Sequence, residues 1–350
     1  MNIKIASHTI SVGNPAFIIA ELSANHNHNF DIAVKTIEAA KDAGANAIKL
    51  QTYTADTITL DCDNEYFQIR QGTIWDGTTL YKLYKQAYTP WEWQPKLKKI
   101  AEDLGLVCFS SPFDKLAVDF LEKINVPAYK VASFEITDIP LIQYIASKGK
   151  PVIISTGIAD EEDIQLAIDT CKKAGNDKII LLKCTSEYPA PYSRMNLKAI
   201  PYLIDKFNTI VGLSDHSMGI AAPVASIALG ALVIEKHLIL DRKIGGPDSQ
   251  FSLEPNEFKE MVTAIRQTEE ALGNAELLRD EKVIKSRQFS RSLFAVKDIK
   301  KGELFTEDNV RSIRPGFGLH PKHLPDILGK KANRDIKKGL PIDEKDLNYF

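Results

Sequence analysis

Three lysines, Lys49, Lys130 and Lys183, follow apolar stretches that are typical of buried β-strands. An unpaired ammonium group is costly to bury, so lysines at the ends of three separate strands indicate a bound anion. Serine and threonine residues stand beside them, and their hydroxyl groups would complete a phosphate or carboxylate site by hydrogen bonding. Each lysine taken alone is explained equally well by an ion pair with Glu21 or Glu135, or by a side chain that reaches solvent.

Two histidines, His216 and His237, end the last two of these apolar stretches. Their imidazoles would converge on one divalent ion and leave positions open for water and substrate. Asp215 or Glu235 would orient these ligands or bind the ion directly. The alternative is a pair of hydrogen-bonded histidines that hold loops, because two histidines alone are a weak metal signature. His26, in an Asn-His-Asn-His-Asn tract, is expected to tie its own loop by side-chain hydrogen bonds.

Apolar runs of strand length alternate with amphipathic segments of helix length. There are eight such runs, at residues 17–22, 47–53, 106–111, 128–133, 152–157, 179–186, 210–216 and 232–238. Alternating strands and helices predict a parallel sheet, and eight units predict a closed (β/α)8 TIM barrel. The first run is not followed by a Gly-x-Gly-x-x-Gly motif, which would favour an open doubly wound sheet.

The active site of a (β/α)8 barrel lies at the carboxyl ends of its strands. Polar residues gather there in this sequence, although a barrel core needs only Val, Ile and Leu. They are Glu21, Lys49, Gln51, Ser110, Ser111, Lys130, Ser133, Glu135, Ser155, Thr156, Lys183, Thr185, Ser214, Asp215, His216, Glu235, Lys236 and His237. Asp248 follows the eighth strand, where its carboxylate would hold hydroxyl or amide groups of a sugar. Residues 56–88 form a long insertion, expected as an irregular flap at the functional end, with Trp75 as a packing residue.

The chain is longer than one ordinary core requires, which predicts a second, smaller domain. We expect the barrel at residues 1–276, a charged linker at 277–289 and a small β-rich domain at 290–350. Within the tail, the sequence Asp-Ile-Lys-Lys-Gly occurs twice, at 298–302 and 335–339, and each copy is typical of a strand end and turn. A core of about 60 residues is marginal alone and gains stability from packing on a partner.

The composition excludes several classes of protein. Lys and Arg number 44 against 46 Asp and Glu, a net charge of −2, whereas a nucleic-acid-binding protein shows a basic excess. The four cysteines form no Cys-x-x-Cys pair, which suits a reducing cytosol. The longest apolar stretch, at residues 220–234, is interrupted by Pro223 and Ser226 and falls short of the ~20 residues that a membrane span needs. We therefore expect a soluble cytoplasmic protein.

The polar motifs, taken in order, resemble those of the sialic acid synthase family. They are Glu21-Leu-Ser-Ala-Asn25-His26, Ile48-Lys49-Leu-Gln51-Thr-Tyr53, Phe109-Ser-Ser-Pro-Phe113, Tyr129-Lys130-Val-Ala-Ser133-Phe-Glu135, Ser155-Thr-Gly157, Lys183-Cys-Thr-Ser-Glu-Tyr188-Pro, Gly212-Leu-Ser-Asp-His216, Glu235-Lys-His237 and Gly246-Pro-Asp248. Arg314-Pro-Gly316 is similar to a loop of that family's C-terminal antifreeze-like (SAF) domain. The Glu-Leu-Ser-Ala-Asn-His start and the insertion are similar to the branch of the family that makes pseudaminic acid.

The resemblance implies a condensation of phosphoenolpyruvate with the open-chain aldehyde of an amino sugar, giving a nine-carbon 2-keto acid and phosphate. The implied sugar is 2,4-diacetamido-2,4,6-trideoxy-L-altrose. The resemblance also implies a cofactor, Mn2+ or another divalent ion such as Mg2+ or Co2+, and a domain-swapped homodimer. The implied roles are metal ligands His216 and His237; a catalytic Glu21; phosphoenolpyruvate contacts Lys49, Gln51, Ser111, Lys130, Ser133, Ser155, Ser186 and Ser214; and sugar contacts Glu135, Tyr188, Asp248 and Arg314, the last from the partner's tail domain.

Three alternatives stay open at this point. An N-acetylneuraminic or legionaminic acid synthase would share the chemistry but take another sugar. A (β/α)8 aldolase would form a Schiff base on Lys130 or Lys183. A carbohydrate-binding or ice-binding protein without enzyme activity is suggested by the tail domain alone.

Overall fold

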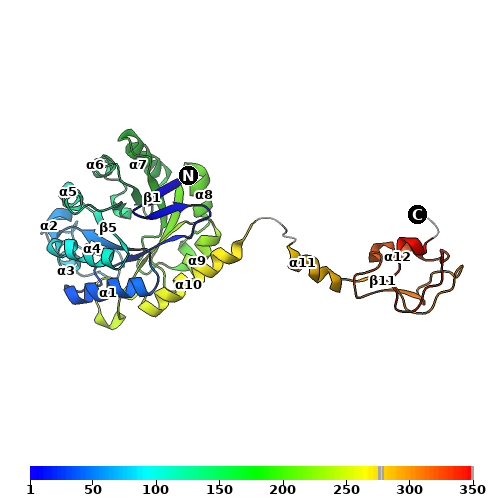
Figure 1. Ribbon diagram of the computed structural model, residues 1–350. Coiled ribbons are helices and arrows are strands. Elements are labelled where there is room, and N and C mark those ends of the chain that lie inside the picture. Colours follow the sequence, from blue (N-terminus) through cyan, green and yellow to red (C-terminus); the bar gives the residue numbers. More distant parts are fainter. Residues whose placement is uncertain (275–276, 278–279, 348–350) are drawn as a thin grey trace. The chain divides into compact units, whose positions relative to one another are not determined.

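The computed structural model describes residues 1–274, 277 and 280–347, which fall into two compact units, Met1–Gly273 and Asn274–Phe350. The first unit contains a closed barrel of eight parallel strands, which confirms the predicted (β/α)8 fold (Figure 1). The barrel strands are β3 (Phe17–Glu21), β4 (Ala47–Thr52), β5 (Val107–Pro112), β6 (Tyr129–Val131), β7 (Val152–Ser155), β8 (Ile179–Cys184), β9 (Ile210–Asp215) and β10 (Val233–His237).

Helices surround this barrel and bury the outer faces of its strands. They are α1 (Phe30–Asp42), α4 (Gln94–Asp103), α5 (Lys115–Lys123), α6 (Ile139–Ala146), α7 (Glu161–Lys173), α8 (Ala199–Phe207), α9 (Ala221–Ala228) and α10 (Pro255–Leu272), with 3-10 turns η1 (Trp91–Trp93), η2 (Ser133–Glu135), η3 (Tyr192–Arg194), η4 (Arg242–Ile244) and η5 (Ser249–Phe251). All residues of β9 and β10 are buried, as expected of parallel strands covered on both faces. Gly212 is required where these strands meet, because a Cβ there would lie 2.3 Å from the Val233 carbonyl oxygen.

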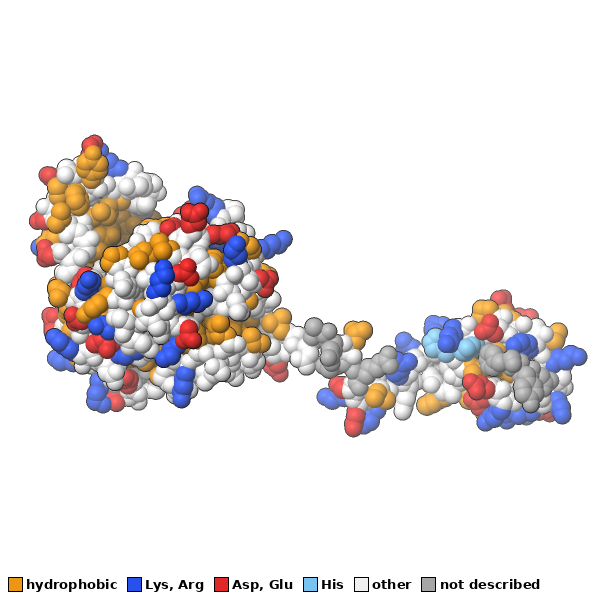
Figure 2. Space-filling model, turned by 90° about the horizontal axis from the view of Figure 1, so that it is seen from above, with side chains coloured by type: hydrophobic (Ala, Val, Ile, Leu, Met, Phe, Trp, Pro, Cys, Tyr) orange, Lys and Arg blue, Asp and Glu red, His pale blue; other side chains and the backbone are white. Residues whose placement is uncertain are grey.

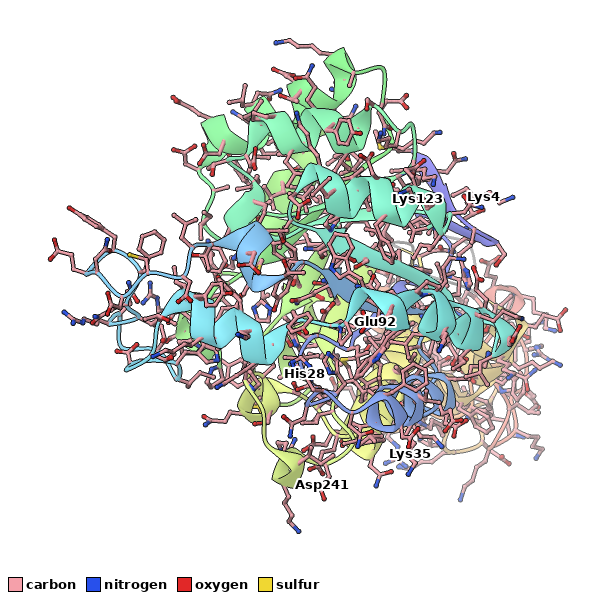
Figure 3. All side chains as sticks on the ribbon, turned by 90° about the vertical axis from the view of Figure 1, so that its left-hand side faces the viewer. Lys4, His28, Lys35, Glu92, Lys123 and Asp241 are labelled. Atoms are coloured by element: carbon pink, nitrogen blue, oxygen red, sulfur yellow. The ribbon has the colours of Figure 1, made fainter. Side chains whose placement is uncertain are left out.

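Two further features complete the first unit. A hairpin of β1 (Asn2–Ile5) and β2 (His8–Ser11) precedes the barrel. The insertion at residues 56–88, drawn in light blue and cyan in Figure 3, extends outward beside the barrel and contains most of α2 (Ala55–Ile58) and α3 (Leu80–Ala87). Our expectation of an irregular flap is therefore wrong for its second part. Helix α3 begins there because the Thr79 hydroxyl accepts a hydrogen bond from the Lys82 backbone N–H, which is a usual N-cap contact.

The second unit is a small β-rich domain. It holds α11 (Glu281–Ser286), β11 (Ser292–Ala295), β12 (Val310–Ile313) and α12 (Leu324–Ile327), with η6 (Arg287–Phe289), η7 (Pro321–His323) and η8 (Glu344–Asp346). Strands β11 and β12 pair antiparallel. Residues 277–289, expected as a linker, hold α11 and η6, although 278 and 279 lie outside the described residues. The expected barrel boundary at 276 and the chain end at 348–350 also lie outside them.

The two copies of Asp-Ile-Lys-Lys-Gly pair with each other in this unit. Ile299 and Ile336 exchange backbone hydrogen bonds of 2.8 Å in both directions. The aspartate of each copy accepts from the backbone of the other copy, at 2.8 Å in both cases: Asp298 from Lys338, and Asp335 from Lys301. The two copies of the repeat therefore form a pair of equivalent turns that are joined by these hydrogen bonds.

The surface carries both signs of charge. Figure 2 shows basic and acidic side chains interspersed over the visible face of the barrel unit, in keeping with the net charge of −2. Within the described ranges, none of the helices combines the length and the apolar character that crossing a membrane would take.

Candidate active site

A cavity of about 590 Å3 lies at the carboxyl ends of the barrel strands. Most of the sequence-predicted site residues line it: Lys49, Gln51, Lys130, Ser133, Glu135, Ser155, Tyr188, Ser214, His216, His237 and Asp248. Side chains of a strand alternate between its two faces, so Glu235 and His237 face this cavity while Lys236 between them does not. The barrel thus brings the polar ends of its strands together around one cavity.

Lys49 and Lys130 share a network of buried carboxylates on the floor of the cavity. The Lys49 Nζ lies 2.6 Å from Glu21 Oε2 and 3.6 Å from Glu235 Oε1. Lys130 Nζ lies 3.9 Å from the same Glu235 oxygen, which also accepts from Ser214 Oγ at 3.0 Å. The expected ion pair of Lys49 with Glu21 is present, whereas Lys130 pairs with Glu235.

Burial and charge shift the pKa values of these groups in different directions. Burial raises the pKa of Glu21 to about 7, although Lys49 acts in the opposite direction. Burial also raises the pKa of Glu235, but Lys130 and Lys49 outweigh it and hold that pKa below its usual value. Burial lowers the pKa of Lys130. Glu235 is therefore the ionised partner of the two lysines, and Glu21 is suited to exchange a proton near neutral pH.

Hydroxyl groups complete this floor. Ser155 Oγ is buried and has no hydrogen-bond partner among the described residues, so it is available to a ligand. Ser133 Oγ accepts from the Gly157 N–H at 3.1 Å. Gly157 is needed there, because a Cβ would lie 2.1 Å from Ser186 Oγ and 2.7 Å from Ser133 Oγ. Ser133 Oγ, Ser186 Oγ and Cys184 Sγ therefore pack closely around Gly157, which has no side chain.

Four predicted residues lie at the edge of this arrangement or outside it. Glu21 is fully buried and does not itself line the cavity, but it contacts Lys49 and Gln51, which do. Ser111 does not line the cavity but accepts from Lys49 Nζ at 3.3 Å. Ser186 does not line the cavity, but its Oγ lies 4.0 Å from Sγ of Cys184, which does. Arg314 belongs to the other unit, where it is exposed and follows β12.

The expectation for Lys183 is wrong. Its Nζ donates to the backbone oxygen of Cys184 and to Thr185 Oγ1, at 2.5 and 3.4 Å, and it does not line the cavity. The neighbouring residue Cys184 lines the cavity instead, so strand alternation turns Lys183 away. Two lysines, rather than three, meet at the floor.

The two histidines lie side by side, with ring centroids 5.3 Å apart. His216 Nδ1 lies 3.0 Å from the Thr185 carbonyl oxygen, which can only accept, so Nδ1 carries a proton and Nε2 is the nitrogen that could bind a cation. His237 Nδ1 is buried and has no hydrogen-bond partner among the described residues. Burial, together with the charge of His216, lowers the pKa of His237 well below its usual value. A neutral, unpartnered imidazole beside a second one fits a divalent cation.

The protein supplies few other ligands for such a cation. Over the described parts of the chain, no three His, Cys, Asp and Glu side chains gather as a metal-binding group. Asp248 Oδ2 lies 3.9 Å from His237 Nδ1, too far for a hydrogen bond. Burial lowers the pKa of His216, but Cys184 more than offsets this and raises it, so cation binding there would release a proton. Water and substrate would complete the coordination.

Aromatic residues cover the histidines. The Tyr188 ring lies 4.4 Å from His216 and 5.0 Å from Phe251, measured between centroids. Trp75 of the insertion lies 5.2 Å from Tyr188. Our sequence reasoning missed Phe251 and favoured packing over sugar stacking for Trp75, because an aromatic residue in a loop carries no signal of what it faces. His26 Nδ1 accepts from the His28 N–H at 3.1 Å, which is the contact within the loop that the Asn/His tract predicts. His26 is also buried, and its Nε2 lies 3.0 Å from Thr89 Oγ1.

Asp248 and Glu135 are two further carboxylates that line the cavity. Asp248 Oδ2 accepts from Ser23 Oγ at 2.5 Å and from the Ala24 N–H at 3.4 Å, which ties the 246–252 loop to the loop after β3. Gln51 Nε2 donates to the same Ser23 Oγ at 2.9 Å and to Glu21 Oε1 at 3.1 Å. Burial raises the pKa of Glu135 to about 7, and its Oε2 has no hydrogen-bond partner among the described residues.

The raised pKa of Glu135 makes stability depend on pH. The unfolded chain binds the Glu135 proton with an ordinary pKa of 4.5 and the folded chain with a pKa of about 7. Between these values the folded state holds more protons, so this residue lowers the free energy of unfolding as pH rises. We expect wild type to lose Tm relative to Glu135→Gln between pH 4.5 and 7, measured by thermal melts. Parallel curves for the two proteins would contradict the assignment.

Comparison with known proteins places this geometry in a family. Residues 36–277 match the NeuB family and residues 290–348 match the SAF domain. A protein named pseudaminic acid synthase from Campylobacter jejuni is 54% identical over 94% of this chain and 96% of its own length. A protein of the same name from Helicobacter pylori is 46% identical over 95% of this chain and 98% of its own length.

The solved structures agree. The crystal structure of N-acetylneuraminic acid (sialic acid) synthetase from Leptospira borgpetersenii, in complex with citrate, superposes with a TM-score of 0.73 at 33% identity, over 82% of this chain and 95% of that one. This match confirms the resemblance to the sialic acid synthases, and the match of residues 290–348 confirms the expected SAF domain. The chain belongs to the NeuB family and carries a SAF domain after its barrel.

Proposed function

We propose that this protein is a pseudaminic acid synthase. It condenses phosphoenolpyruvate with 2,4-diacetamido-2,4,6-trideoxy-L-altrose and releases pseudaminic acid and phosphate by C–O cleavage. The observation that carries the proposal is one cavity in which two buried lysines and three serines face a pair of histidines. The relatives support the choice of sugar: proteins named pseudaminic acid synthase are 46–54% identical to this chain, and those named N,N'-diacetyllegionaminic acid synthase are 37–38% identical.

The floor of the cavity would bind phosphoenolpyruvate. Lys49 and Lys130 would offset the charge of its phosphate and carboxylate, and Ser133, Ser155 and Ser214 would donate hydrogen bonds to the same oxygens. Glu235 holds both lysines in place. Fixed positive groups of this kind stabilise charge that develops in the transition state without reorganising.

C3 of phosphoenolpyruvate would attack the aldehyde carbon of the sugar, and water would then add at C2. Glu21, whose pKa is raised to about 7, would accept the proton of that water on its carboxylate. Loss of phosphate from C2 by C–O cleavage then leaves the 2-keto group. Tyr188, Glu135 and Asp248 would orient the sugar and exclude water around it.

His216 and His237 would hold a divalent cation, which we propose to be Mn2+. When bound, such a cation supplies Lewis-acid polarisation of the aldehyde oxygen. We expect His237→Ala to lose both Mn2+ binding, measured by calorimetry, and turnover. His320→Ala, in the tail, serves as the control. Undiminished Mn2+ binding by His237→Ala would remove His237 from the ligand set.

We also propose that Arg314 reaches the active site of a second copy in a domain-swapped dimer. The proposal is supported by the resemblance to the family and by the small core of the tail, in which ten of the described apolar residues form one buried cluster. Lys49→Ala and Arg314→Ala homodimers should each be nearly inactive. Unfolding and refolding the two variants together should restore activity, because a mixed dimer contains one intact site. Absence of recovery in confirmed mixed dimers would contradict the exchange.

The position of bond cleavage tests the reaction class. Phosphoenolpyruvate with an oxygen isotope in its bridging position should yield phosphate that carries the label, as C–O cleavage requires. Label retained in the keto acid would contradict the proposal. Trapping with borohydride and pyruvate should leave the protein unmodified, whereas a Schiff-base aldolase would become labelled on Lys130.

A further inference from the structure

The apolar face of helix α3 has no protein core to pack against. Leu80, Leu83, Tyr84 and Ala87 recur at the spacing that places them on one side of a helix. All four line the active-site cavity, yet none of the residues of α3 is fully buried. An amphipathic helix ordinarily buries such a face. The apolar face of α3 therefore covers the active-site cavity, and it would contact a ligand that binds there.

Other apolar side chains extend the same wall. Ile58 of α2 and Ile69 of the insertion line the cavity, as do Tyr53 and Phe113 from the barrel. The Tyr53 ring contacts Tyr84 and Phe113, with centroids 5.6 and 5.1 Å away. Charged and hydroxyl groups thus form the floor of the cavity at the strand ends, and apolar side chains, mostly from the insertion, form a wall above. Tyr66, Gln68, Gln71 and Thr73 of the insertion line the cavity as well.

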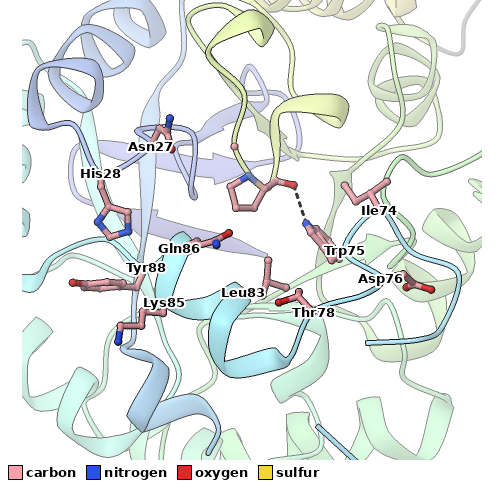
Figure 4. A pocket seen from close by; sticks show the side chains of 12 residues that line it. Asn27, His28, Ile74, Trp75, Asp76, Thr78, Leu83, Lys85, Gln86 and Tyr88 are labelled. Atoms are coloured by element: carbon pink, nitrogen blue, oxygen red, sulfur yellow. Dashed lines mark hydrogen bonds between the residues drawn. The ribbon is translucent and has the colours of Figure 1, made fainter. Parts of the chain in front are cut away.

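Trp75 fastens the insertion to the barrel. Its Nε1 donates to the Pro247 carbonyl oxygen at 2.9 Å, as Figure 4 shows. A second, outer pocket of about 690 Å3 lies beyond this contact, and Leu83, Trp75 and Pro247 line both spaces. These three residues form the partition between the outer pocket and the cavity. The hydrogen bond between Trp75 and Pro247 therefore stabilises the partition between the cavity and the outer pocket.

The reaction sets the direction of the sugar in this cavity. Its aldehyde carbon must meet C3 of phosphoenolpyruvate at the charged floor, and C6 is at the other end of the open chain. We infer that the apolar wall formed by Ile58, Ile69, Leu80, Leu83 and Tyr84 binds the deoxygenated C6 end and selects against a sugar with a hydroxyl group there. This inference rests on the proposed function and assigns specificity to the insertion.

The physical basis is desolvation. A hydroxyl group packed against the aliphatic side chains of this wall would lose its hydrogen bonds to water, and these side chains offer no replacement. Burial of an unpaired hydroxyl group is unfavourable. A methyl group gains from the same burial. Hydrophobic pockets discriminate between such close analogues by about tenfold to a hundredfold, which is the range expected here.

A matched pair of sugars tests the inference. They are the proposed 6-deoxy diacetamido sugar and its counterpart with a hydroxyl group at C6. We expect wild type to favour the deoxy sugar in kcat/KM by about tenfold or more. Leu80→Gln should reduce this ratio severalfold while the KM for phosphoenolpyruvate stays unchanged. Lys82→Gln, on the exposed side of the same helix, should keep the wild-type ratio.

The outcomes separate this inference from the proposed function. Ile58→Thr, which keeps the branch at Cβ and replaces the ethyl arm with a hydroxyl group, guards against a folding defect in Leu80→Gln. The inference would be overturned by a wild-type kcat/KM ratio near one for the two sugars, or by the wild-type ratio in both folded variants. Neither result would contradict the proposed synthase activity. Phosphate release with neither sugar would overturn the proposed function as well.

Discussion

We expect Lys49→Ala to lower kcat/KM for phosphoenolpyruvate by about a hundredfold to a thousandfold, the usual cost of removing one preorganised charge-stabilising group. Lys49 is buried and contacts Glu21, Glu235 and Ser111. Its removal takes away a cation that would bind the substrate and leaves two carboxylates facing an anion. Both kcat and KM should therefore change, because the group acts on bound substrate and on the transition state alike.

Steady-state kinetics of phosphate release measure this effect. Lys99→Ala removes a lysine whose side chain is 74% exposed and paired with Asp103 on the surface of α4, so it should leave kcat and KM unchanged. Lys49→Arg keeps the charge but not the shape and should retain part of the activity. Wild-type kinetics in Lys49→Ala would contradict the assignment of the anion site.

The second large effect concerns stability. Lys236 and Asp215 are direct neighbours on β10 and β9, and their charged atoms lie 2.5 Å apart with both side chains fully buried. Asp215 Oδ1 also accepts from the Ser217 N–H at 2.9 Å, and Lys236 donates to the Ser217 carbonyl oxygen. Removing one partner of a buried pair typically costs about 3–5 kcal/mol, so we expect Lys236→Met to lose that much free energy of unfolding.

A double-variant cycle in chemical denaturation checks this value. Asp215→Leu alone should also be strongly destabilised, because it leaves the Lys236 ammonium group unpaired. The double variant Lys236→Met/Asp215→Leu should lose much less than the sum of the two, since neither charge is then left alone. Additive losses, or a loss below about 1 kcal/mol for Lys236→Met, would contradict the coupling. Asp215 and Lys236 directly precede His216 and His237 in the sequence, and both bind the backbone of Ser217, so the pair also holds the segment that follows His216.

The barrel could be predicted because its strands leave a clear sequence signal. Parallel strands that are covered on both faces are continuous apolar runs, and each run ended in polar residues that meet at one end of the barrel. Lys183 was wrongly assigned to the anion site because an apolar run predicts where a strand lies, but not which of its last residues faces the inside of the barrel. Cys184 and Lys183 differ by one position, and strand alternation sends them to opposite faces.

Other features could not be predicted, for separate physical reasons. The role of α3 was missed because its apolar residues cover a cavity, and the spacing of such residues does not distinguish a cavity from a core. Glu235 was expected beside the metal ligands, whereas it serves as the shared partner of two lysines from other strands. That partnership depends on contacts across the barrel, and a single strand carries no sign of them.

Phosphate release from phosphoenolpyruvate tests the central claim most directly. Purified protein with Mn2+ would be given the diacetamido-trideoxy altrose, N-acetylmannosamine or the legionaminic acid precursor. The account predicts phosphate release with the first sugar and little with the other two. Release with another sugar alone would keep the chemistry and overturn the choice of substrate. No release with any of the three, from folded and metal-loaded protein, would contradict the synthase itself.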